Sequence, residues 1–318
     1  MPADNVMKII SKTIDFKIPE DTVVTIGKFD GIHKGHALVF DRMLKYRAQG
    51  LKSVIFTFDI PVSMLIDGTD SRVLTTNLEK RRIFEKLGAD YLVEFPFNEK
   101  TASISAEGFI EEFLLERLNM KAIVIGSDLK FGHGGRGTAD TLREYAKDHG
   151  YEVTVIDKLM HGEHEISSTI IRECIERGDI EAANEMLLHP YFFYGEVVHG
   201  RRIGRTLDFP TVNLIPKEDK LLPPNGVYFS VVEYEGTKYN AITNIGRKPT
   251  VEGERAAIGI ETYIYDFDSL IYGQELTVSL FKFLRPEMRF GSLDELKGQL
   301  TKDVAEGEKW HKNHPQIP

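Results

Sequence analysis

The sequence has little cysteine and no long apolar run. Cys174 is the only cysteine among 318 residues, so no disulfide can form within the chain. A single thiol is typical of proteins that stay in a reducing compartment. No stretch approaches the about 18 consecutive apolar residues of a membrane-spanning helix, and residues 1–12 hold no apolar signal core. We therefore expect a cytoplasmic protein without a membrane partner.

Positive charge is also in deficit. The chain has 40 Lys and Arg against 49 Asp and Glu, which gives a formal net charge of −9. Such a surface does not attract nucleic acid or anionic lipid over long distances. The phosphate-binding loop G-x-x-x-x-G-K-[ST] occurs nowhere either. An anionic ligand would need local help from Arg, Lys, His, Mg²⁺ or a helix N-terminus, and small molecules are the expected partners.

The length allows two domains at about 150 residues each, and the first part of the chain alternates strand and helix patterns. Helical spacing covers residues 37–48, 107–118 and 141–149, and a further helix is predicted to begin at its cap, Asn77. The strand-like runs are 22–27, 53–58, 91–95, 122–125 and 153–156. This alternation predicts a doubly wound, Rossmann-like α/β domain with a parallel sheet, whose ligands bind beyond the carboxyl ends of the strands.

The pattern changes after His189. Strand-like runs then follow one another at 192–198, 227–234, 239–245, 258–265 and 276–283. Strands without intervening helices predict a closed or partly closed antiparallel β-barrel. Ser292 and Glu295 have the spacing of a capping box and predict a terminal helix to about Glu306. We place the boundary near residue 188, with domains 1–187 and 188–318.

The first candidate site is the stretch Gly27-Lys-Phe-Asp-Gly-Ile-His-Lys-Gly-His36, between the first strand and the first helix. Glycines let the backbone approach a ligand closely, and a helix start offers free N–H groups to a phosphate. His33 and His36 can both point at one phosphate and stabilise its charge during displacement. A Gly-rich turn with two exposed histidines is the alternative. A zinc site is another alternative, but no Glu or Cys residues lie at the spacing that would complete a known zinc-ligand set.

This stretch resembles the N-terminal module of the bacterial bifunctional riboflavin kinase/FMN adenylyltransferases, also called FAD synthetases. Two further segments match in order, the run from Ile125 to Gly132 and Ile166-Ser-Ser-Thr-Ile-Ile-Arg172. In the latter, hydroxyl groups at a helix start and an Arg one turn later would clamp pyrophosphate. The resemblance implies AMP transfer from ATP to FMN. It implies ATP contacts from Gly27, Phe29, Asp30, Gly31, His33, His36, Asp128, Ser167, Ser168, Thr169 and Arg172.

The chain departs from the family pattern on the flavin side of this module. The family often carries F-x-P-H-P after the second strand, whereas this chain has Phe58-Asp-Ile-Pro-Val62, without the histidine. Lys130 stands where Arg is usual. Both departures concern the acceptor and leave the reaction type unchanged.

The second candidate site joins a basic glycine loop, 195–205, to the run Phe209-Pro-Thr-Val-Asn213. Its glycines and arginines, among them Gly200, Gly204 and Arg205, form a local anion site in an acidic protein. Thr211 and Asn213 are two residues apart on a predicted strand, so they share a face. Their oxygens can coordinate Mg²⁺ held between nucleotide phosphates. The alternative is a plain turn into an edge strand.

This context resembles the riboflavin kinase module, with Asp208 in place of a usual Gly and Tyr263 where His is common. The resemblance implies that Glu261 is the general base for the riboflavin 5′-hydroxyl and that Arg285 holds phosphate or flavin. A carboxylate that accepts the proton of an attacking alcohol fits this chemistry. Otherwise Glu261 is a solvated strand residue and Arg285 a surface cation.

The two resemblances together span residues 20–305 and predict a bifunctional enzyme. With ATP and Mg²⁺ it phosphorylates riboflavin to FMN, and with a second ATP it adenylylates FMN to FAD and pyrophosphate. A monofunctional kinase and a non-enzymatic flavin sensor are the rivals. Retention of His33, His36, Ser168 and Arg172 disfavours the first, and the base at Glu261 disfavours the second. The oligomeric state stays open.

Overall fold

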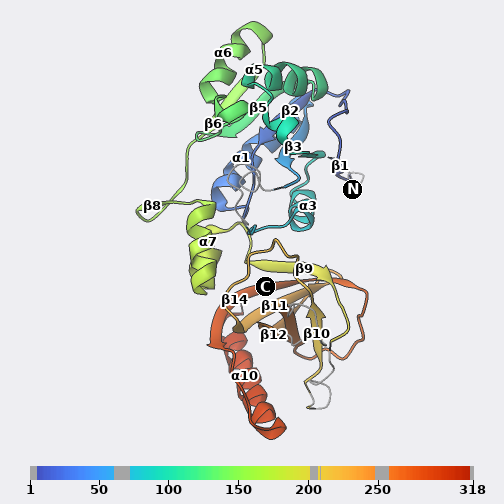
Figure 1. Cartoon of the computed structure of the whole chain (residues 1–318), viewed down its shortest axis with the longest axis vertical. Helices are drawn as coiled ribbons and strands as arrows, with labels where there is room; N and C mark the ends of the chain where they lie inside the picture. The colour runs from blue at the N-terminus through green and yellow to red at the C-terminus, as the bar shows by residue number, and fades with distance from the viewer. Residues whose placement is uncertain (1–5, 61–71, 201–206, 208, 248–257, 316–318) are drawn as a thin grey trace. The chain divides into compact units, whose positions relative to one another are not determined.

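The computed structural model describes residues 6–60, 72–200, 207, 209–247 and 258–315. The chain forms two compact units, Met1–Ser168 and Thr169–Pro318 (Figure 1). In the described part of the chain, none of the helices is long and apolar enough to cross a membrane.

The first unit is built on a six-stranded sheet in which every neighbouring pair is parallel. The order is β1-β4-β3-β2-β5-β6. The strands are β1 (Lys8–Ser11), β2 (Thr22–Ile26), β3 (Lys52–Phe58), β4 (Tyr91–Phe95), β5 (Met120–Gly126) and β6 (Glu152–Ile156). The predicted α/β sheet and its five strands are confirmed. The prediction missed β1, because this short edge strand is half-exposed and lacks a continuous apolar run.

Helices connect these strands and differ in detail from the predicted ones. They are α1 (Lys34–Lys45), η1 (Tyr46–Gln49), α3 (Asn77–Lys86), α4 (Glu99–Ala102), α5 (Ala106–Gly108), η2 (Phe109–Arg117), η3 (His133–Gly135) and α6 (Ala139–His149). Most of the predicted helix 107–118 has π-helical bonding, which apolar spacing alone does not distinguish from an α-helix. The cap of α3 is Thr76, not Asn77, because the Thr76 hydroxyl accepts the Glu79 N–H and Glu79 accepts the Thr76 N–H.

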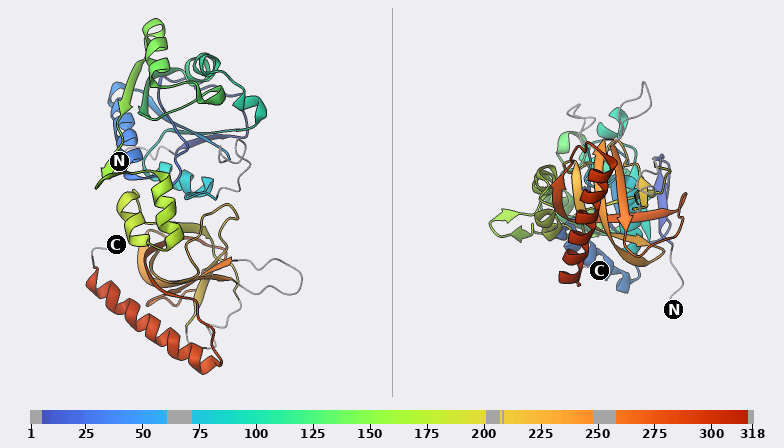
Figure 2. Two further views of the ribbon diagram at one scale, coloured as in Figure 1. Left: turned by 60° about the vertical axis from the view of Figure 1, so that its left-hand side comes forward. Right: turned by 90° about the horizontal axis from the view of Figure 1, so that it is seen from below.

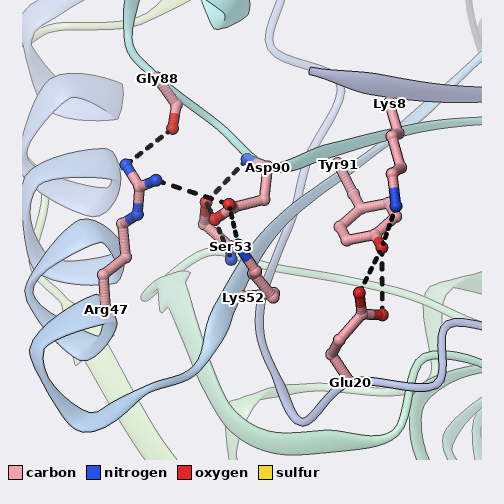
Figure 3. A network of polar contacts seen from close by, with 8 residues as sticks. All are labelled: Lys8, Glu20, Arg47, Lys52, Ser53, Gly88, Asp90 and Tyr91. Atoms are coloured by element: carbon pink, nitrogen blue, oxygen red, sulfur yellow. Dashed lines mark hydrogen bonds and ion pairs between the residues drawn. The ribbon is translucent and has the colours of Figure 1, made fainter. Parts of the chain in front are cut away.

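The amino ends of β3 and β4 are joined by a buried carboxylate, Asp90 (Figure 3). It accepts the N–H and hydroxyl of Ser53 at 2.9 and 2.8 Å, and the Lys52 ammonium at 2.9 Å. Burial raises the pKa of Asp90, but these bonds and the Arg47 guanidinium outweigh it and lower that pKa below its usual value. The stability that Asp90 contributes is therefore lost as pH falls through this lowered pKa. This network stabilises the end of the sheet at which β3 and β4 begin, opposite the carboxyl ends of the strands.

The second unit is a curled antiparallel sheet with the order β10-β13-β12-β11-β14-β9 (Figure 2). Its strands are β9 (Phe192–Glu196), β10 (Thr211–Leu214), β11 (Gly226–Tyr234), β12 (Thr237–Arg247), β13 (Ile258–Ile264) and β14 (Glu275–Pro286). Among the described residues, a bridge between Val198, just after β9, and Asn213 of β10 joins the two ends of this order, with a Val198 N–H to Asn213 O distance of 2.8 Å. The predicted, partly closed barrel is confirmed.

Helix α10 (Leu293–Asn313) lies along this sheet and runs seven residues beyond the predicted end at Glu306 (Figure 2). It packs through Trp310, which stacks on Phe229 at 4.9 Å. Ser292 caps the helix as predicted, but the capping box is incomplete. The Glu295 carboxylate accepts the N–H of Gly291 instead of the N–H of Ser292.

Two helices precede the barrel strands in the second unit, α7 (Ser168–Arg177) and α8 (Ile180–Met186). Asn184 of α8 donates to the Leu280 carbonyl of β14 at 2.9 Å and accepts the Tyr191 N–H at 2.7 Å. Glu181 pairs with Lys282 of the same strand at 2.9 Å. The contacts therefore attach α8 to the barrel, although the predicted boundary at residue 188 would separate them.

We expect a fragment that begins at residue 169 to be more stable than one that begins at residue 188. The shorter fragment loses both hydrogen bonds of Asn184, and an intramolecular hydrogen bond contributes about 0.5–1.5 kcal/mol. Urea unfolding of both fragments, followed by circular dichroism, measures the difference. Equal midpoints would support the boundary at residue 188.

Candidate active sites

The two histidines of the first site form the N-terminal cap of α1. The His36 N–H donates to Nδ1 of His33, and the His33 N–H donates to Nδ1 of His36, both at 3.3 Å. The imidazole rings stack with centroids 3.7 Å apart and an interplanar angle of 16°. A histidine pair thus replaces the usual serine and glutamate of a capping box. The motif places both side chains at one helix start, as predicted.

These bonds also fix where each imidazole carries its proton. Nδ1 accepts in both rings, so the proton of the neutral ring lies on Nε2. Burial lowers the pKa of His33 to about 4, although the Asp128 carboxylate opposes this. Burial, His33 and Lys80, in that order, lower the pKa of His36 well below its usual value. At neutral pH the pair is therefore uncharged and offers two Nε2–H donors.

We expect His33 to remain neutral from about pH 5 to pH 8, where an ordinary histidine titrates. Its folded pKa of about 4 lies below the unfolded value of 6.5, so the unfolded chain binds the proton first on acidification. This group therefore lowers stability as pH falls from 6.5 toward 4. Imidazole Cε1–H shifts measured by NMR during a pH titration test this, with a peptide of residues 27–36 as the unfolded control. A His33 midpoint near the peptide's would contradict the expectation.

The loop before α1 has an unusual backbone. Phe29 and Ile32 have φ angles of +48° and +21°, a region that residues other than glycine rarely adopt, and Gly31 has +76°. A Cβ at Gly31 would lie 2.7 Å from Leu74, so the close approach needs glycine there. Phe29 is 3% exposed and packs edge-on against His36 with ring centroids 5.2 Å apart. Any contact of Phe29 with ATP would therefore come from its backbone.

Bonds from other segments hold this loop in place. The Asp30 carboxylate accepts the Thr75 N–H, and Thr75 Oγ1 accepts the Gly31 N–H, both at 3.1 Å. The Ser168 hydroxyl donates to the Asp30 carbonyl at 2.7 Å. Ser168 and Asp30 were both predicted to bind ATP, and the structure joins them directly. Their side chains fix the loop.

The remaining predicted ATP residues come from three segments of the chain. Gly27 follows β2, and a Cβ there would lie 2.8 Å from the Phe29 ring. Asp128 follows β5 and is 3.6 Å from the Lys158 ammonium. Ser167 precedes α7. Thr169 and Arg172 lie in its first turns and belong to the second unit.

The second site gathers on one face of the barrel sheet. Asn213 of β10 lies directly opposite Glu261 of β13, and Glu261 lies opposite Asn244 of β12. Thr211 pairs with Tyr263 in the same way. Thr211, Asn213, Tyr263 and Glu261 therefore share a face, as directly paired residues do. Burial, followed by Asp266 and Glu308, raises the pKa of Tyr263.

Gly200 lies against Asn213. A Cβ at Gly200 would come within 2.7 Å of the Asn213 amide oxygen and 2.6 Å of its nitrogen. Any larger residue would displace this amide, which is 4% exposed. The predicted Gly204 and Arg205, and the departure at Asp208, lie outside the described residues.

Arg285 contacts α10. Its Nε and Nη2 donate to the two carboxylate oxygens of Asp303 at 2.9 and 2.5 Å, and its Nη1 donates to the Pro286 carbonyl at 2.9 Å. Asp303 is 3% exposed and also accepts from Gln299 at 2.8 Å. This bidentate pair attaches α10 to β14, and the predicted flavin contact of Arg285 stays a prediction.

Lys80 contacts the histidine loop and was not among the predicted site residues. It lies on α3, is 6% exposed, and donates from Nζ to the Lys28 carbonyl at 2.8 Å. A buried lysine is rare unless it has a partner. In the sequence, nothing distinguishes Lys80 from the other charged residues of this helix, so its burial could not be predicted.

Comparisons with known proteins cover both parts of the chain. A family profile described as FAD synthetase matches residues 15–170, and one described as riboflavin kinase matches residues 187–311. A bifunctional riboflavin kinase/FMN adenylyltransferase of Listeria monocytogenes is 36% identical over 284 residues, which are 88% of this chain and 90% of the relative. The chain belongs to this bifunctional family. The family predicted from the motifs is thus confirmed.

Other members of the riboflavin kinase/FMN adenylyltransferase family are similarly close. The Bacillus subtilis protein of that name is 35% identical over 296 residues, which are 92% of this chain and 93% of that protein. A crystal structure of a Streptococcus pneumoniae protein, titled as a macrolide-efflux protein, has a TM-score of 0.81 and 32% identity. It covers 96% of this chain and 99% of its own. Both units of the fold therefore recur together in a solved structure.

Proposed function

We propose that this chain makes FAD from riboflavin in two steps at separate sites. At the β10–β13 face, ATP phosphorylates riboflavin to FMN. At the His33–His36 loop, a second ATP transfers AMP to FMN and gives FAD and pyrophosphate. Membership of the bifunctional family supports both reactions. The flavin is substrate and product in this scheme, not a bound redox cofactor.

The two Nε2–H donors at the start of α1 carry the adenylyl-transfer proposal. An FMN phosphate oxygen forms a bond to the α-phosphorus of ATP while the bond from that phosphorus to the bridging oxygen breaks, so pyrophosphate leaves. Negative charge on the α-phosphate oxygens grows during this exchange, and fixed N–H donors stabilise it. Neutral rings suit this role, because no proton has to move. His33 and His36 are therefore the proposed catalytic residues.

Further residues around the loop are proposed to hold ATP. The backbone of the loop can approach the phosphates closely because of Gly27 and Gly31. The hydroxyl groups and the guanidinium at the start of α7 would contact the pyrophosphate part of ATP. The proposed set is Gly27, Phe29, Asp30, Gly31, Asp128, Ser167, Ser168, Thr169 and Arg172.

Glu261 carries the kinase proposal, because it lies opposite Asn213 on the shared face. The riboflavin 5′-hydroxyl oxygen bonds to the γ-phosphorus of ATP, the bond to the bridging oxygen breaks, and ADP leaves. The hydroxyl proton passes to the Glu261 carboxylate and then to water. Gly200, Gly204 and Arg205 are proposed to hold the nucleotide phosphates, and Arg285 the flavin.

Mg²⁺ fits this face of the sheet. The Thr211 hydroxyl and the Asn213 amide oxygen are hard ligands of the kind that Mg²⁺ prefers, and the missing side chain of Gly200 lets the Asn213 amide keep its position. We propose that Thr211 and Asn213 hold the ion. When bound, it would neutralise charge on the nucleotide phosphates.

We propose a cytoplasmic location for the enzyme. Cys174 is a free, buried thiol, and burial raises its pKa. A thiol of this kind is typical of a reducing compartment. Riboflavin, FMN and ATP are the proposed small-molecule partners, and no nucleic acid takes part.

Incubation of the pure chain with riboflavin, ATP and Mg²⁺ tests the function, with chromatographic separation of the flavins. We expect FMN to rise first and FAD to follow. Accumulation of FMN without FAD would show that the chain is a riboflavin kinase without adenylyltransferase activity. Unchanged riboflavin would exclude both proposed reactions.

A further inference from the structure

The loop that carries the histidine pair is strained, and α3 supplies much of what holds it. Non-glycine residues with positive φ, such as Phe29 and Ile32, are strained and persist only where neighbours fix them. Thr75, just before α3, binds Asp30 and Gly31. The start of α3 therefore sets the conformation from which His33 and His36 project.

Lys80 completes this support from one turn inside α3. Its ammonium donates to the Lys28 carbonyl at 2.8 Å, and the Thr57 hydroxyl donates to the same oxygen at 3.2 Å. Lys28 is the residue before Phe29, so this bond acts where the backbone turns into its unusual conformation. A long side chain at 6% exposure loses most of its rotamer freedom, so it defines the geometry well.

We propose that Lys80 is a positioning residue for adenylyl transfer, which holds the Lys28 carbonyl and keeps a positive charge beside the histidine pair. The inference rests on the proposed role of His33 and His36. It assigns Lys80 two effects that can be measured separately, one on loop geometry and one on the protonation of His36.

The charges that face His36 come from three segments. His33 faces it from the cap of α1, Lys80 from α3, and Asp128 acts through His33 from the end of β5. Phe29 and Phe40 supply apolar contacts at ring distances of 5.2 and 6.4 Å. Lys80 is the cation of this set and opposes protonation of His36. Its removal therefore raises the pKa of His36 toward the usual value.

Lys80→Met in the full chain tests both effects. The side chain keeps its length but loses the charge and the bond. We expect FAD formation from FMN to slow by about 10- to 100-fold, the range for loss of one buried charged hydrogen bond. The acid limb of the pH profile of FAD formation should move to higher pH, because the pKa of His36 rises. Riboflavin phosphorylation in the same preparation should stay within about twofold, and Lys86→Met, at an exposed position of α3, is the matched control.

Two further variants make each outcome decisive. Lys80→Arg keeps the charge and should keep the wild-type acid limb, whatever its turnover. A Lys80→Met enzyme that is as active as Lys86→Met, or slower with an unmoved acid limb, would overturn the inference. His36→Ala is measured alongside. If His36→Ala kept the wild-type rate of adenylylation, the proposed function of the loop would be wrong. If His36→Ala lost adenylylation and Lys80→Met did not, only the inference about Lys80 would be wrong.

Discussion

Replacing His36 with alanine is expected to slow FAD formation from FMN by about 10²-fold or more, the usual effect of losing one fixed transition-state donor. The variant removes the Nε2–H that we propose stabilises the α-phosphate, and also the Nδ1 that accepts the His33 N–H. Both losses act in the first unit. The measurement is turnover of FMN and ATP to FAD, with riboflavin phosphorylation assayed in the same preparation.

The kinase step is the internal control for His36→Ala. His164→Ala, at an exposed histidine of the small β7–β8 hairpin (Met160–His161 and His164–Glu165), is the matched variant and should leave both steps unchanged. Equal losses of both activities in His36→Ala would show that the histidine supports folding. Unchanged adenylylation would remove it from the site.

Glu261→Gln has the other large expected effect. The amide keeps the size of the side chain but cannot accept a proton at neutral pH. If Glu261 is the base, riboflavin phosphorylation should fall by about 10²–10⁴-fold, the typical contribution of a positioned general base. Riboflavin should still bind, as fluorescence titration would measure, because the amide keeps the size and much of the hydrogen bonding of the carboxylate.

FAD formation from supplied FMN should continue in Glu261→Gln, since we propose that this step takes place at the histidine loop. Glu275→Gln changes an exposed strand glutamate of the same unit, which bonds to Tyr194 at 2.6 Å, and serves as the matched control. A Glu261→Gln enzyme with near wild-type kinase turnover would contradict the assignment. Asp266 or Asp268 would then become the next candidates for the base.

The sequence predicted what depends on short stretches of chain. His33 and His36 are three residues apart, so the helix start brings them together without tertiary contacts. The buried strands of the first unit were visible as apolar runs. The short strand β1 was not, because an edge strand needs no such run.

Features that depend on packing between distant segments were not predictable. Lys80 reaches a carbonyl 52 residues earlier in the chain, and nothing near it in the sequence marks that contact. Asn213 and Glu261 become neighbours only through strand register, which periodicity does not specify. The predicted role of Glu261 came from the family resemblance. Asp303 likewise binds Arg285 only because α10 lies along the barrel.

The pairing of β10 with β13 has a consequence for folding kinetics. β11 and β12 are joined by a tight turn and can pair early, whereas Asn213 and its partner Glu261 are 48 residues apart in the chain. Contacts between residues far apart in the sequence form late, because closing a longer loop costs more conformational entropy. Asn213 therefore reaches its position opposite Glu261 only after β11 and β12 have paired. A refolding chain should regain phosphoryl transfer only after most of its β-structure has formed.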